Sequence, residues 1–161
     1  MPQLMESLVE HVAACFTGIW IQTNESHEAI AEILEAVQEQ KLPWTCLCWD
    51  CVKGLSTGAG AGDGNTDPIA VINALSGVES RDDDSTTLLF IHNLNRFLNS
   101  PEVMQATVNQ ILNGRGNRAI IVVLSPIVDI PVELQKLFVV IEHKLPDKQQ
   151  LQAIAASLPE T

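Results

Sequence analysis

The stretch Leu88-Leu89-Phe90-Ile91-His92-Asn93 decides how the rest of this 161-residue sequence is interpreted. Four consecutive apolar residues are followed at once by two polar residues. Strands that are apolar throughout are typical of parallel sheets with both faces covered. We therefore expect a buried strand over residues 86–91, with His92 and Asn93 at its carboxyl end, where the functional residues of α/β folds gather.

The same pattern, a short apolar run between polar residues, recurs on both sides of this stretch. It predicts further strands over residues 18–23, 44–51, 119–124 and 138–142. Most of the segments between the strands have apolar residues at helical spacing. The predicted helices begin near Leu4, Asn24, Asp67, Ser100 and Asp147, and one helical turn is predicted over residues 131–136. This alternation predicts a three-layer α/β/α fold with a five-stranded, mainly parallel sheet, in one domain over residues 1–161.

The charge balance limits the classes of partner. Twenty acidic side chains against nine basic ones give a net charge of −11, which would repel a phosphate backbone, so we expect no nucleic-acid partner. The acidity indicates either solubility alone or a basic protein partner. No apolar stretch is long enough to cross a bilayer and no secretory leader is visible, so we expect no membrane contact and a cytoplasmic location.

Three cysteines lie close together at Cys46, Cys48 and Cys51, and the last two have C-x-x-C spacing. A structural zinc site uses four ligands, usually from two such pairs, and the sequence has no second pair. On a strand Cys46 and Cys48 share one face, whereas Cys51 points to the other. We interpret the cluster as core packing, with a metal or redox site as the weaker alternative.

The two polar residues after the strand bear on catalysis. In an ATPase the corresponding strand ends in Asp-Glu, where the aspartate holds Mg²⁺ and the glutamate polarises the attacking water. His92 and Asn93 stand at these Walker B positions. Imidazole is a poor ligand for Mg²⁺, which prefers oxygen donors, and a carboxamide is no base at neutral pH. We therefore expect no catalytic residue, no cofactor-binding residue and no cofactor.

The phosphate-binding loop of such enzymes should follow the first strand, and it needs glycines and a lysine. Residues 23–28 contain neither, and they carry Glu25 and Glu28 instead. The glycine-rich segment 54–64 resembles a phosphate loop in composition only, so we expect an exposed, poorly packed loop there. Asp50 ends the second strand where a ribose-binding carboxylate can lie, but no glycine fingerprint precedes it, which favours a packing role.

Several short motifs share one order along the chain. They are Trp49-Asp50, Gly54-Leu55, Thr66-Asp67-Pro68, residues 89–98, Ser100-Pro101-Glu102-Val103, residues 119–126, residues 130–134 and Lys144-Leu145-Pro146-Asp147. In this order they resemble the N-terminal region of a family of bacterial and plastid-encoded AAA-type ATPases. The resemblance implies a degenerate copy of the AAA fold that precedes a module with intact Walker motifs. It also places Ser125 at the position of the sensor-one polar residue.

These observations lead to one main hypothesis of function. We expect a degenerate, non-catalytic AAA-like domain that acts through protein–protein contact, with a second copy or an attached AAA module as partner. A weak nucleotide-binding sensor is the alternative, and a metal or redox site at the cysteine cluster is the lowest. In an AAA-like sheet the first strand should be central and the second at one edge, and the phosphate cleft should be closed or acidic.

Overall fold

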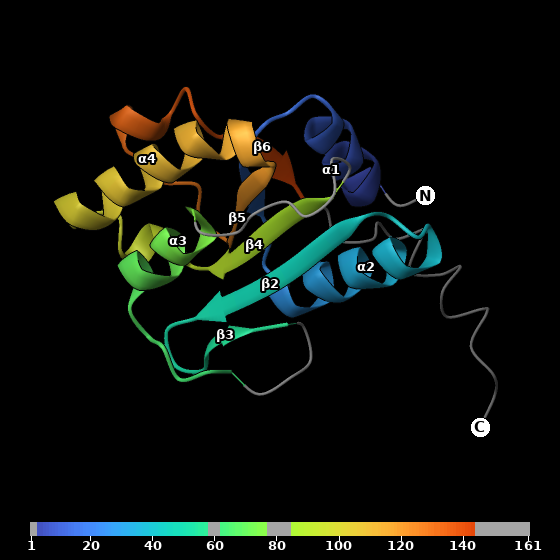
Figure 1. Cartoon of the computed structure of the whole chain (residues 1–161), viewed down its shortest axis with the longest axis horizontal. Helices are drawn as coiled ribbons and strands as arrows, with labels where there is room; N and C mark the ends of the chain where they lie inside the picture. Colours follow the sequence, from blue (N-terminus) through green and yellow to red (C-terminus); the bar gives the residue numbers. More distant parts are fainter. Residues whose placement is uncertain (1–2, 58–61, 77–84, 144–161) are drawn as a thin grey trace.

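A sheet of six strands lies between two pairs of helices in the computed structural model, which describes residues 3–57, 62–76 and 85–143 (Figure 1). The elements in chain order are α1 (Gln3–Ala13), β1 (Gly18–Gln22), α2 (Ser26–Glu39), β2 (Trp44–Asp50), β3 (Gly54–Ser56), α3 (Pro68–Ser76), β4 (Thr86–His92), η1 (Leu94–Arg96), α4 (Pro101–Asn117), β5 (Ala119–Ser125), η2 (Val132–Leu134) and β6 (Val139–Glu142). The helix expected from Asp147 lies outside the described residues.

The strand order is β3-β2-β4-β5-β1-β6, and every neighbouring pair is parallel except β2 with β3. The predicted three-layer, mainly parallel α/β fold is thus confirmed, with six strands in place of five. Two expectations about the order were wrong. The first strand, β1, lies second from one edge instead of at the centre, and β2 is not at the edge because β3 pairs along its outer side.

The additional strand β3 corrects the prediction of an exposed, poorly packed loop over residues 54–64 for its first part, because residues 54–56 pair with β2, whereas Asp63 and Gly64 are exposed as expected. Gly54 has a φ of 81°, a conformation that glycine adopts without a steric penalty, and it brings the chain back antiparallel to β2. The carboxylate of Asp63 accepts hydrogen bonds from the backbone N–H groups of Leu55 and Asn65. The carbonyl of Asn65 in turn accepts one from the indole of Trp49. These bonds hold residues 54–56 and 63–65 in place, whereas residues 58–61 of the predicted loop lie outside the described residues.

Alternating side chains of each central strand enter two separate cores, as the period of two in a strand requires. Leu88 and Phe90 of β4 pack toward α1 and α2, whereas Leu89 and Ile91 pack toward α3 and α4 (Figure 1). Because both faces are covered, the central strands are apolar throughout, which is the signal that predicted them. Among the described residues no helix has the length and apolar character needed to span a bilayer.

Some helix boundaries differ from the expected ones. The predicted cap Asn24 is replaced by Glu25, whose side chain makes no capping hydrogen bond. The helix predicted to begin near Ser100 runs to Asn117 and contains Gly114, where a Cβ would collide with the carbonyl oxygen of Ala119, so this glycine serves close packing and does not end the helix. The predicted caps Ser100 and Asp67 do accept hydrogen bonds from the first turns of α4 and α3.

Candidate functional site

The connection between β1 and α2 occupies the place where an ATPase of this fold would bind phosphate. It has only three residues, Thr23, Asn24 and Glu25, whereas a G-x-x-x-x-G-K-[ST] loop needs about eight residues including the start of its helix. Thr23 is 2% exposed, and its N–H donates to the carbonyl of Ser125 at 2.9 Å. The hydroxyl oxygen of Thr23 accepts the N–H of Glu25 at 3.0 Å. The connection is therefore short and internally bonded.

His143, which directly follows the outer strand β6, contacts the same connection. Its Nδ1 lies 2.7 Å from the hydroxyl of Thr23, and its Nε2 lies 3.6 Å from a carboxylate oxygen of Glu32 in α2. With the ring proton on Nε2, facing Glu32, Nδ1 accepts the hydroxyl proton of Thr23. The backbone N–H of His143 donates to the carbonyl of Gln22. The polar groups at the end of β1 are thus used within the fold.

His92 lies at the carboxyl end of β4, on the face covered by α1 and α2. Its ring lies 5.4 Å from the ring of His27, in the first turn of α2, measured between centroids. Burial lowers the pKa of His92, and the charges of His27 and Lys53 lower it further, while Asp50 opposes them. A half-buried, neutral imidazole beside a second histidine is a poor site for Mg²⁺.

Asp50 is engaged in the turn between β2 and β3. One carboxylate oxygen accepts the N–H groups of Val52 and Lys53, at 2.8 and 2.7 Å. Partial burial would raise the pKa of Asp50, but these two hydrogen bonds and the nearby charges of His92 and Lys53 hold it below its ordinary value. The carboxylate thus stabilises the turn that leads into β3.

Asn93 adopts a left-handed conformation with a φ of 57° and follows directly on β4. Its N–H donates to the carbonyl of Leu124 and its carbonyl accepts the N–H of Arg96, so its backbone joins β4 to η1. Its side chain is exposed.

Comparison with protein families assigns the chain to a known family. The family described as "SpoVK-like AAA ATPase, N-terminal domain" matches residues 4–143. The chain belongs to this family. The resemblance expected from the ordered motifs is therefore confirmed. Comparison with curated proteins gives no match.

Two solved structures share the fold of this SpoVK-like N-terminal domain. Drosophila ORC bound to AT-rich DNA and Cdc6 superposes with a TM-score of 0.55 at 13% identity, over 96% of this chain and 62% of that chain. Drosophila ORC bound to DNA gives a TM-score of 0.54 at 11% identity, over 94% of this chain and 44% of that chain. The chain thus spans less than two thirds of either, and at these identities the likeness is one of fold.

Ser125, at the sensor-one position implied by the resemblance, is fully buried in the SpoVK-like domain. Its hydroxyl oxygen accepts a hydrogen bond from the indole N–H of Trp20 at 3.0 Å, and its O–H donates one to the carbonyl of Ile127 at 2.5 Å. The side chain lies on the α3–α4 face of the sheet with Trp20, opposite the face of His92. The structure thus does not bring Ser125 together with His92.

The cysteine cluster divides between core and surface. Cys48 is buried with Cys46 packed beside it, whereas Cys51 is exposed in the turn after β2. Burial and, to a lesser extent, the neighbouring Cys48 raise the pKa of Cys46 to about 11. Within the described ranges no three His, Cys, Asp or Glu side chains cluster as metal ligands do.

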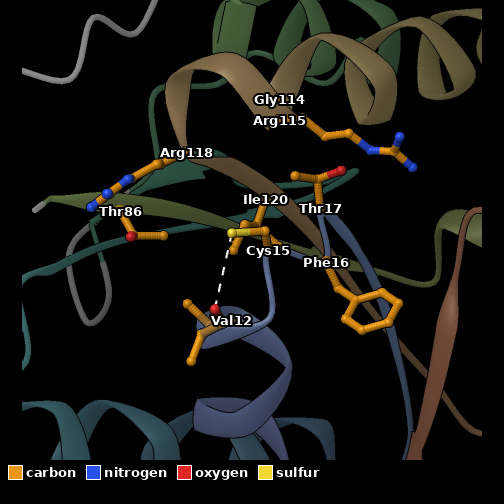
Figure 2. Close-up of a pocket in the computed structure, with 10 residues that line it drawn as sticks. Val12, Cys15, Phe16, Thr17, Thr86, Gly114, Arg115, Arg118 and Ile120 are labelled. Carbon is orange, nitrogen blue, oxygen red and sulfur yellow. Dashed lines mark hydrogen bonds between the residues drawn. The ribbon is translucent and has the colours of Figure 1, made fainter. Parts of the chain in front are cut away.

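A pocket that sequence reasoning missed lies at the other end of the strands, where the parallel strands begin (Figure 2). Its volume is about 220 Å³. The lining residues come from five elements or their flanks: Val12, Ala13, Cys15, Phe16, Thr17, Thr86, Gly114, Arg115, Arg118 and Ile120. They are widely separated in sequence and share no motif, so only the fold brings them together.

Proposed function

We propose that this SpoVK-like N-terminal domain is a non-catalytic AAA-like domain that acts through protein–protein contact. Its role would be oligomerisation, recruitment, or regulation of an AAA ATPase module attached to the same chain. The three-residue connection after β1 carries this proposal. The N–H groups of Thr23 and Glu25 and the Thr23 hydroxyl are used within the fold, and the connection has neither the glycines nor the lysine that a phosphate cradle requires.

The end of β4 supports the same proposal. His92 offers a nitrogen ligand with a lowered pKa where Mg²⁺ would need a carboxylate, and Asn93 offers a carboxamide where a base would act. Glu25 and Glu28 add two negative charges at the start of α2, the end of the helix that would face a phosphate. A triphosphate would thus meet two carboxylates at a connection that offers neither a lysine nor a metal ligand to offset their repulsion.

An exposed apolar surface favours a protein partner. Three of the seven large hydrophobic side chains that are exposed among the described residues lie within six residues, in the segment after β5: Ile127 at 51%, Val128 at 38% and Val132 at 78%. We call these three residues the post-β5 surface. Exposed apolar side chains mark a contact site where they form one continuous patch.

Two measurements on the purified chain test the absence of catalysis. Phosphate release from ATP with Mg²⁺ should not exceed the buffer blank, while an active AAA ATPase assayed in parallel serves as the positive control. The double variant His92→Asp with Asn93→Glu should remain inactive, because it restores the acids without the cradle. Turnover in either protein that chelation of Mg²⁺ abolishes would contradict the proposal.

Thermal unfolding with ATP or ADP separates the contact role from nucleotide sensing. A ligand present at 100 times its dissociation constant stabilises a protein by about 2.7 kcal/mol, so even weak binding should raise the midpoint at millimolar nucleotide. We expect no rise. A rise with either nucleotide would favour a nucleotide sensor.

Sedimentation velocity tests the contact itself. The chain is compared with Val132→Glu, which places a charge on the post-β5 surface, and with the matched control Leu112→Glu on the exposed face of α4. Both are measured alone and with a separately purified AAA ATPase module added in excess. We expect Val132→Glu to weaken association and Leu112→Glu to preserve it. Equal association in all three proteins would exclude the post-β5 surface.

A further inference from the structure

Two histidines from distant parts of the sequence meet where the parallel strands end. His92 is the last residue of β4, and His27 lies in the first turn of α2. Their ring centroids are 5.4 Å apart, and the ring planes are inclined by 38°. His92 is half-buried, whereas His27 is exposed. Within the described part of the chain no hydrogen bond or ion pair engages the ring nitrogens of either residue, so these nitrogens are available to a ligand.

The pairing of the strands brings a carboxylate to the same place. β2 and β4 are parallel neighbours, and Trp49 is in register with Ile91. The next residues along the two strands, Asp50 and His92, therefore lie beside each other on one face of the sheet, the face that α2 covers. The Oδ1 atom of Asp50 accepts both N–H groups of the following turn. The second oxygen of this carboxylate makes no hydrogen bond within the described residues.

The charges around the two rings favour a cation. Glu25 and Glu28 lie at the start of α2, and Asp50 lies at the end of β2. Against these three carboxylates Lys53 adds one positive charge near His92, and Lys53 is exposed, so water and salt screen it. The amino end of α2 adds the equivalent of about half a positive charge. The local balance therefore remains negative, in keeping with the acidity of the whole chain.

The spacing of the two rings fits a single metal ion. A zinc–nitrogen bond measures about 2.0–2.1 Å and the centre of an imidazole ring lies about 1.1 Å beyond the bonded nitrogen, so two rings on one tetrahedral ion have centroids about 5 Å apart. The observed separation of 5.4 Å is close to this value. Imidazole suits Zn²⁺, Ni²⁺ and Cu²⁺, whereas Mg²⁺ prefers oxygen ligands.

The protonation state of His92 is also the one that a metal needs. Burial lowers the pKa of His92, and the charge of His27 lowers it further, so the ring is neutral at pH 7. Only the neutral ring has a lone pair to give to a metal ion. Asp50 acts in the opposite direction on this pKa but attracts a metal cation just as it attracts a proton.

We propose that His27 and His92 together bind one divalent transition-metal ion of the Zn²⁺ class. Among the described residues no third His, Cys, Asp or Glu completes a ligand set, so water fills the remaining positions. The second oxygen of Asp50 accepts a hydrogen bond from this water and orients it, as carboxylates beside metal sites commonly do. The site does not depend on the contact function proposed above, and it turns a position vacated for Mg²⁺ into one for a softer ion.

Isothermal titration calorimetry with zinc chloride tests the proposal on the full chain, purified without a histidine tag. We expect one equivalent of Zn²⁺ to bind and magnesium chloride to give no binding heat. His27→Ala should weaken Zn²⁺ binding at least about tenfold, and Asp50→Asn should weaken it by about tenfold. Because His27 is exposed, its replacement should preserve the fold, which circular dichroism checks. The matched control is His11→Ala, in the last turn of α1, which should bind as the unchanged chain does.

The competing ligands for Zn²⁺ are thiolates, and two variants separate them from the histidine pair. Cys51→Ser removes the exposed thiol after β2, and Cys15→Ser removes the exposed thiol after α1. Both should retain the affinity of the unchanged chain. Equal affinity in the unchanged chain and in His27→Ala would overturn the proposal. No binding at millimolar Zn²⁺, or a loss of binding in Cys51→Ser, Cys15→Ser or His11→Ala that matches the loss in His27→Ala, would overturn it as well.

Discussion

Lys41 holds a conformation that helices usually give to glycine. Its φ is 51°, its N–H returns to the carbonyl of Gln38, and the N–H of Leu42 returns to that of Val37, which together form a Schellman motif at the end of α2. A left-handed conformation costs a residue with a Cβ about 1–2 kcal/mol. The sequence has no glycine at this point, so the left-handed cap could not be located from sequence alone.

Replacing Lys41 with glycine should therefore stabilise the protein. We expect Lys41→Gly to raise the free energy of unfolding by about 1 kcal/mol, because glycine adopts this conformation without the steric cost. Urea denaturation monitored by circular dichroism measures the change. Lys41→Ala is the control, since it removes the charge but keeps the Cβ. An equal gain in both variants would show that the charge, not the backbone, is responsible.

His92 should make stability depend on pH. Burial, aided by His27 and Lys53 and opposed by Asp50, lowers its pKa from the ordinary value of 6.5, so the native state binds this proton less tightly than the unfolded chain. The free energy of unfolding should then decrease as the pH falls below about 6.5. His92→Gln should lose this contribution. Urea denaturation from pH 8 to pH 5 measures it, and a difference between the two proteins that is constant with pH would refute it.

At the scale of elements, the hydrogen bond between Trp20 and Ser125 joins β1 to the end of β5 inside the core. Ser125→Ala would leave the buried indole N–H without its acceptor, so we expect a loss of about 1–3 kcal/mol in the free energy of unfolding. Trp20→Phe in the same background should cost less than the sum of the two single changes, because it removes the unsatisfied donor. Additive losses in this double-mutant cycle would show that the bond contributes little.

The strands could be predicted from sequence because a single physical property defines them. A strand covered on both faces must be apolar at every position, so β4 and β5 begin and end within one residue of the predicted bounds. β3 could not be predicted in this way, since it has three residues and depends on the backbone of Gly54 and on hydrogen bonds to Asp63. β3 is held in place by contacts with other segments, and its own composition does not specify a strand.

The candidate sites show the same division. The ends of strands are readable, so His92 and Asp50 could be placed at the carboxyl edge of the sheet from sequence alone. The contact of His92 with His27 and the hydrogen bonds around Thr23 depend on how α2 sits against the sheet, which no local pattern reveals. The pocket where the parallel strands begin is lined by residues from the ends of both α1 and α4. Nothing in the sequence links these two helix ends.

At the scale of the whole molecule, the net charge of −11 should prevent binding to nucleic acid. The two ORC structures that share the fold are complexes with DNA, but their identity to this chain is too low to transfer that property. Nonspecific binding to DNA typically has a dissociation constant of about 10⁻⁴–10⁻⁶ M. We expect no change in the fluorescence anisotropy of a labelled AT-rich duplex at low salt. A saturable, salt-sensitive rise would contradict this.

The two outer strands of the sheet are short: β3 has three residues and β6 has four. A strand at the edge of a sheet can recruit another chain through its unpaired backbone groups, and short edges offer few of them. Contacts between copies would then depend on side chains, which exchange readily, instead of on a continuous ladder of backbone hydrogen bonds. An assembly built on side-chain contacts can come apart and form again, whereas a sheet extended from chain to chain would grow into a fibre.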